Sequence, residues 1–220
     1  ILLMDEIDPR CRVIRGAGRP GATTMAGLDE SVGVVLLIGH HGRAGSFPGI
    51  MAHTISYGAF KLVRLGGEPI GEADFFAIRA GELGVPIGMI SGDQVVAEQV
   101  AAICPWAERV IVKEALANQS GNCIVPVRAR ELIRAGAERA VRRARAGELR
   151  AYCDRSPPYE FEVDLREPMN DAMRANLRSL ASDFEIVDER CVRVRAPNMD
   201  VGFRRVAYLG YADRPGVTRH

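Results

Sequence analysis

The sequence predicts an α/β fold: an open, mostly parallel sheet with flanking helices, followed by a smaller C-terminal α+β unit. Short continuous apolar runs, as at residues 32–38, are typical of strands buried on both faces of a parallel sheet. Segments with helical spacing separate these runs. After a Ser-Pro-Pro linker at residues 156–158, apolar and charged residues alternate instead. These observations predict an α/β domain over residues 1–150 and an α+β unit over residues 151–220.

The first domain is expected to alternate strands with helices joined by right-handed crossovers. Gly84 terminates one helix, and Asp93 is a good N-cap for the next, which Pro105 ends. Strands are expected at residues 12–14, 32–38, 85–90 and 110–112, and helices at residues 72–83, 93–103 and 126–146. In the C-terminal unit we expect a strand at 160–166, a helix at 171–180, a hairpin of 184–187 with 191–194, and a helix at 199–212.

Composition excludes several classes of partner. Lysine and arginine number 29 against 28 acidic residues, so a net charge of +1 gives no electrostatic basis for binding nucleic acid. The arginine-rich helix at 126–146 lacks interleaved aromatic residues and is expected to be a solvated face. No apolar run is long enough to span a membrane. The five cysteines have no C-x-x-C spacing and are expected to be buried hydrophobes in a reducing, cytoplasmic compartment.

Three of the four histidines fall in one short window, as His40, His41 and His53. His41 follows the strongest predicted strand, at the edge of the sheet where open α/β folds bind ligands. The connection at residues 42–49 is rich in glycine and contains proline, which predicts a site loop. Imidazoles there can bind zinc or transfer protons. A hydrogen-bonded pair of loop histidines explains the same residues equally well.

Two acidic residues stand at predicted helix starts. Glu72 follows Gly71, and Asp93 follows Ser91-Gly92. Helix capping and the helix dipole favour acidic residues at these positions, so residue type alone makes neither a strong ligand candidate. The G-x-G-x-x-G match at residues 16–21 is interpreted as a turn, because Pro20 and Gly21 disfavour the helix that a dinucleotide site requires.

The order and spacing of short motifs along the chain carry more information than single residues. The motifs are Arg15-Gly16, Arg19-Pro20, Gly27-Leu28-Asp29, Gly39-x-His41-x-Arg43-Ala44-Gly45, Pro48-Gly49-x-Met51-x-His53-Thr54, Gly71-Glu72, Gly84-Val85-Pro86, Ser91-Gly92-Asp93 and Val112-Lys113-Glu114-Ala115. This string resembles the bacterial zinc-dependent D-aminopeptidases, a self-compartmentalising family.

The resemblance implies a metallo-aminopeptidase that releases N-terminal D-amino acids from short peptides with two zinc ions per subunit. By motif match, His41 and Glu72 correspond to zinc ligands, and His53 corresponds to a catalytic histidine. The resemblance also implies a homo-oligomeric ring. The family's N-terminal Asp-x-Glu motif and a further histidine ligand have no counterpart here, so the chain is expected to be truncated at its N-terminus and to supply only part of the site.

Two other functions remain open at this point. The first is a non-catalytic peptide-binding or assembly subunit of the same fold, which need hold no metal. The second is a hydrolase of another metal or ester class. Zinc stoichiometry distinguishes the first from the peptidase, and a substrate panel with chelator controls distinguishes the second.

Overall fold

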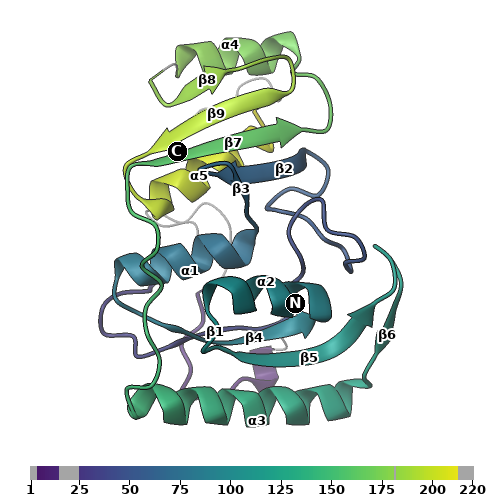
Figure 1. Cartoon of the computed structure of the whole chain (residues 1–220), viewed down its shortest axis with the longest axis vertical. Coiled ribbons are helices and arrows are strands. Elements are labelled where there is room, and N and C mark those ends of the chain that lie inside the picture. The colour runs from purple at the N-terminus through teal and green to yellow at the C-terminus, as the bar shows by residue number, and fades with distance from the viewer. Residues whose placement is uncertain (1–3, 15–24, 181, 213–220) are drawn as a thin grey trace.

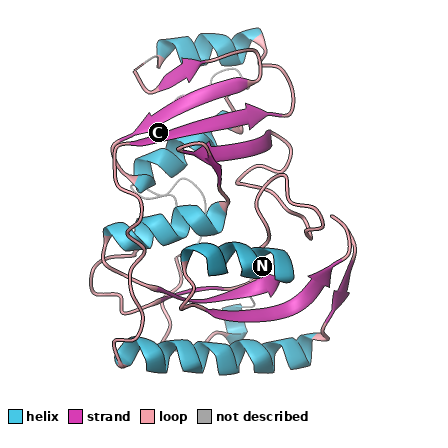
Figure 2. Ribbon diagram, viewed as in Figure 1, coloured by secondary structure: helices cyan, strands magenta, loops and turns pink. Residues whose placement is uncertain are grey.

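A four-stranded sheet and the helices on its two faces form the first part of the fold. The computed structural model describes residues 4–14, 25–180 and 182–212. The strand order is β1 (Val35–Leu37), β4 (Ile87–Asp93), β5 (Glu108–Ala115) and β6 (Gly121–Cys123). The first three strands are parallel and β6 is antiparallel. An open, mostly parallel sheet with flanking helices is therefore confirmed (Figures 1 and 2).

Helices cover this sheet on both sides (Figure 1). The long helix α3 (Pro126–Arg145) packs on one face, where Met89, Val110 and Ala140 form a small apolar cluster. Helices α1 (Glu72–Glu82) and α2 (Gln94–Ile103) lie on the other face. All seven residues of β4 are buried, as expected for a central strand covered by helices on both sides. A short 3₁₀ helix, Met4–Glu6, precedes these elements.

A second sheet is antiparallel and has the order β3, β2, β7, β9, β8. Its strands are β2 (Phe60–Leu65), β3 (Glu68–Pro69), β7 (Tyr159–Leu165), β8 (Phe184–Ile186) and β9 (Cys191–Ala196), with helices α4 (Asp171–Ser179) and α5 (Met199–Leu209). Strands β2 and β3 come from the first half of the chain. The predicted boundary at residue 150 therefore does not separate the sheets, because β2 pairs with β7 along its whole length.

Helix α1 joins the two sheets into one core. Phe75 is fully buried and stacks on Phe161 of β7, with ring centroids 5.3 Å apart. The ring of Phe203 in α5 meets Phe75 edge to face, also at 5.3 Å. Figure 1 shows α1 between the two sheets. The position of α1, and of Glu72 at its start, therefore depends on packing against both sheets.

Some expectations for individual segments are wrong. Residues 12–14 form no strand, and Cys11, Cys123 and Cys153 are exposed rather than buried. Cys104 is buried, and none of the five cysteines is paired. The glycine motif at residues 16–21, with Arg15, lies outside the described residues. Within the described ranges, no helix has the length and apolar character needed to cross a lipid bilayer.

Candidate metal centre

The site begins where β1 ends. The backbone N–H of His40 donates to the carbonyl of Ser91 on β4, with N and O 2.8 Å apart, so this segment still follows the sheet edge. His41 comes directly afterwards, at the carboxyl end of the parallel strands. Open α/β sheets bind their ligands at this edge. The position predicted for His41 from the sequence is confirmed.

The loop after His41 returns His53 to the same point. The backbone N–H of His53 donates to the carbonyl of Gly42 at 3.0 Å. Nδ1 of His41 lies 3.1 Å from the same carbonyl, and Nδ1 of His53 lies 2.7 Å from the carbonyl of Met51. Because a carbonyl only accepts, each Nδ1 carries a proton, so in the neutral imidazole each Nε2 keeps a lone pair for a metal ion. Backbone carbonyls orient metal-binding histidines in this way.

Glu72, the first residue of α1, completes the cluster. Its Oε2 atom lies 3.1 Å from Nε2 of His41 and 3.8 Å from Nε2 of His53. The two imidazoles are stacked, with centroids 3.8 Å apart and planes inclined by 14°. The three candidate ligand atoms lie within 4.8 Å of one another. All three residues singled out in the sequence therefore meet at one point.

The donor set fits a zinc ion. Glu72 Oε2 is buried, and no described group donates a well-directed hydrogen bond to it. A buried carboxylate oxygen without a donor is costly unless a cation compensates it. Imidazole nitrogen and carboxylate oxygen are typical ligands of catalytic zinc sites, which keep one position open. We therefore describe this cluster as a candidate metal centre.

Electrostatic coupling within the cluster is strong. Burial alone would lower the pKa of His41, but the Glu72 carboxylate and the Gly42 carbonyl raise it above its usual value. Burial alone would raise the pKa of Glu72, but His41 and His53 hold it below its usual range. Burial and the neighbouring His41 lower the pKa of His40 to about 4. His40 is therefore neutral near pH 7 while Glu72 is ionised.

Buried polar side chains hold the loop in place. Asp93 caps α2 by accepting from the N–H of Val96 at 3.0 Å, and its other oxygen accepts from the N–H of Ile50 at 2.9 Å. The hydroxyl of Thr54 accepts from the N–H of Ala44 and donates to the carbonyl of Ile70. The predicted cap is confirmed. Its second role, and that of Thr54, could not be found from sequence because both depend on contacts between distant segments.

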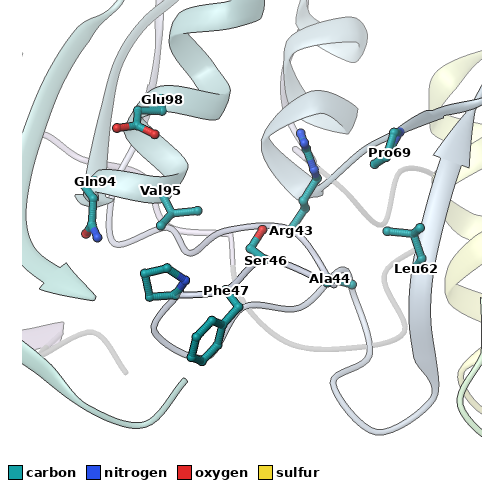
Figure 3. Close-up of a pocket in the computed structure, with 11 residues that line it drawn as sticks. Arg43, Ala44, Ser46, Phe47, Leu62, Pro69, Gln94, Val95 and Glu98 are labelled. Atoms are coloured by element: carbon teal, nitrogen blue, oxygen red, sulfur yellow. The ribbon is translucent and has the colours of Figure 1, made fainter. Parts of the chain in front are cut away.

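A cavity of about 690 Å³ adjoins the loop (Figure 3). It is lined by residues 43–48, by Leu62 and Pro69 of the second sheet, and by Gln94, Val95 and Glu98 of α2. These lining residues do not include the three members of the cluster. The side chain of Phe47 is 79% exposed at this cavity. The cavity therefore adjoins the loop that carries His41 and His53 without being lined by the cluster.

Together, the sheet edge and the imidazole–carboxylate cluster define an α/β protein with a candidate metal site of the catalytic type. The family model of the M55 peptidases, described as D-aminopeptidase, matches residues 2–207. The chain belongs to this D-aminopeptidase family.

Individual relatives agree with the family match. A D-aminopeptidase of Bacillus subtilis (strain 168) is 29% identical over 132 residues, which cover 60% of this chain and 47% of that protein. The chain thus matches less than half the length of this curated relative. A solved structure, the zinc-dependent D-aminopeptidase of Bacillus subtilis, described as a self-compartmentalizing protease, superposes with a TM-score of 0.83 at 21% identity. That match covers 98% of this chain and 76% of the other, and it shows the same fold.

Proposed function

We propose that the protein containing this chain is a zinc-dependent aminopeptidase that releases N-terminal D-amino acids from short peptides. The observation that carries the proposal is that one ligand atom each from His41, His53 and Glu72 lies within 4.8 Å of the others, and that the Glu72 atom is a buried oxygen without a hydrogen-bond donor. Membership of the D-aminopeptidase family supports the reaction class. The zinc dependence of the Bacillus subtilis relative supports the choice of metal.

His41 and Glu72 are the residues proposed to hold zinc. Bound zinc would polarise the scissile carbonyl and lower the pKa of a water molecule. We also propose two zinc ions per subunit, which need more ligands than these two residues provide. Subunits are proposed to assemble as a homo-oligomeric ring, in line with the self-compartmentalizing relative.

His53 is proposed to transfer protons rather than to bind zinc. Its ring is nearly parallel to that of His41, so the lone pairs of the two Nε2 atoms do not converge on one point. An ion about 2.0 Å from both nitrogens would lie far outside both ring planes. With Nδ1 fixed on the Met51 carbonyl, Nε2 of His53 can take a proton from the attacking water and return it to the leaving amine.

Three variants test these roles separately. Zinc content and hydrolysis of D-alanine para-nitroanilide, with the L-isomer as a comparison, are measured for His41→Ala, Glu72→Gln and His53→Ala. The first two should lose zinc and activity together. His53→Ala should keep zinc but lose about 10²–10⁴-fold in kcat, the usual contribution of a proton-transfer group.

The exposed Glu131→Gln change on α3 is a control that should alter neither property. Undiminished turnover in both the His41 and Glu72 variants would refute the proposal. Peptide binding without turnover or zinc would indicate the non-catalytic subunit instead. Loss of zinc in His53→Ala would make His53 a ligand.

A further inference from the structure

Lys113 is a charged group at this sheet edge that the proposed chemistry does not use. Of the 29 lysines and arginines in the chain, only Lys61 and Lys113 are lysines. Lys113 lies in the last part of β5 and pairs with Asp93 at the end of β4. Its side chain is half-buried, and its ammonium group forms no hydrogen bond or ion pair with any described residue. A half-buried cation without a partner is suited to binding an anion.

The face on which this side chain lies follows from its neighbours. Val110 and Val112 pack toward α3. The pairing of β5 with β4 is irregular between Ile111 and Lys113, and the charge of Lys113 interacts with His41, so we place Lys113 on the other face, which carries α1 and α2 (Figure 1). Glu72 begins α1 on that face. Lys113 and the candidate metal centre therefore lie on the same side of the sheet and at the same end of its strands.

The distance from the backbone of Lys113 to the cluster is within the reach of a lysine side chain. His40 contacts Ser91 of β4 through the backbone, and Lys113 lies one strand further on. Neighbouring strands are about 4.8 Å apart, and the four-carbon stem of lysine covers much of the remaining gap. The charges of Lys113 and His41 are close enough to interact. The ammonium group is thus placed beside the cluster but is not part of it.

A short peptide has a negative charge at a fixed distance from its scissile bond. In a dipeptide, the C-terminal carboxylate is only a few bonds from the carbonyl that an aminopeptidase attacks. Arg43, a cation of the site loop, instead interacts electrostatically with half-buried Asp74. We propose that Lys113 binds the C-terminal carboxylate of the substrate and so makes the site selective for dipeptides with a free carboxyl terminus. This inference rests on the proposed function.

Matched substrates test the proposal. kcat and KM are measured for D-alanyl-D-alanine and for its C-terminal amide, which differ only in this charge. Lys113→Met should raise KM for the free acid about tenfold and leave kcat unchanged, because the contact is remote from the reacting bond. KM for the amide should stay within twofold. Lys113→Arg should restore the preference for the acid, and Lys61→Met, at an exposed position of β2, should behave as wild type.

A binding measurement separates failure of this inference from failure of the proposed function. Reductive ¹³C-methylation labels the lysine side chains, and the signal that disappears in Lys113→Met belongs to Lys113. In the Glu72→Gln protein, which should not consume the peptide, the free acid should shift the Lys113 signal and the amide should not. The inference would be overturned if Lys113→Met changed KM equally for the acid and the amide, or if the free acid left the Lys113 signal unshifted. If wild type hydrolyses neither substrate, the proposed function fails and the signal shift alone decides the role of Lys113.

Discussion

Replacing Asp93 with alanine should destabilise the protein by more than the loss of a helix cap. The side chain is fully buried, and its two oxygens accept from Val96 of α2 and from Ile50 of the site loop. Losing the cap costs about 1 kcal/mol. Losing a charged acceptor for the second N–H costs about 1.5–3 kcal/mol. The sum is roughly 2.5–4 kcal/mol, which for a chain of this size lowers Tm by roughly 5–15 °C.

Urea unfolding followed by circular dichroism measures this free energy, and Asn170→Ala supplies the comparison. Asn170 caps α4 by accepting from Met173 at 2.8 Å, so its loss removes a cap alone and should cost about 1 kcal/mol. Asp93→Asn keeps one side-chain oxygen, so its loss of stability should lie between those of Asp93→Ala and Asn170→Ala. It should also speed hydrogen exchange at the Ile50 amide. If Asp93→Ala cost no more than Asn170→Ala, the loop contact would contribute nothing and the reasoning would be refuted.

Two further predictions concern packing and pH. Gly81→Ala places a Cβ atom 1.9 Å from the carbonyl oxygen of Tyr152 and should cost more than about 2 kcal/mol in urea unfolding, whereas Gly33→Ala, with open space around it, should be close to neutral. Burial alone would raise the pKa of Glu108, but Arg139 and Arg143 hold it below its usual value of 4.5. Its ion pairs therefore stabilise the fold above that value and are lost as pH falls through the lower folded pKa. The stability difference between wild type and Glu108→Gln should shrink from about pH 6 to about pH 3; a constant difference would contradict this.

The parallel sheet could be predicted because its signals are local. The apolar run that contains β4 and the Asp93 cap lie next to each other in sequence, and both occur as expected. Strands β2 and β3 were missed although Gly66-Gly67 is a typical two-residue hairpin turn, and both glycines have positive φ. The partner that makes β2 a strand is β7, about a hundred residues away. Pairing at that separation leaves no pattern in a short window.

The candidate site was partly predictable for the same reason. His41 and Glu72 could be named because each follows a recognisable element, and the motif match added His53. Sequence gave no indication that the two imidazoles stack or that Glu72 Oε2 lacks a donor, because these depend on the course of the loop. The position of Lys113 beside the cluster could not be predicted without knowing which face of β5 packs against α3.

The path of the chain between His53 and Glu72 has a consequence for biosynthesis. The polypeptide leaves the cluster after His53, forms β2 and β3 in the second sheet, and returns to begin α1 with Glu72. Strand β2 pairs with β3 at once but gains its second neighbour only when β7, ending at Leu165, has been made. In a nascent chain, His53 and Glu72 are therefore held together by the second sheet only after Leu165 has been synthesised, so binding of a metal ion at this cluster would indicate that both sheets have formed.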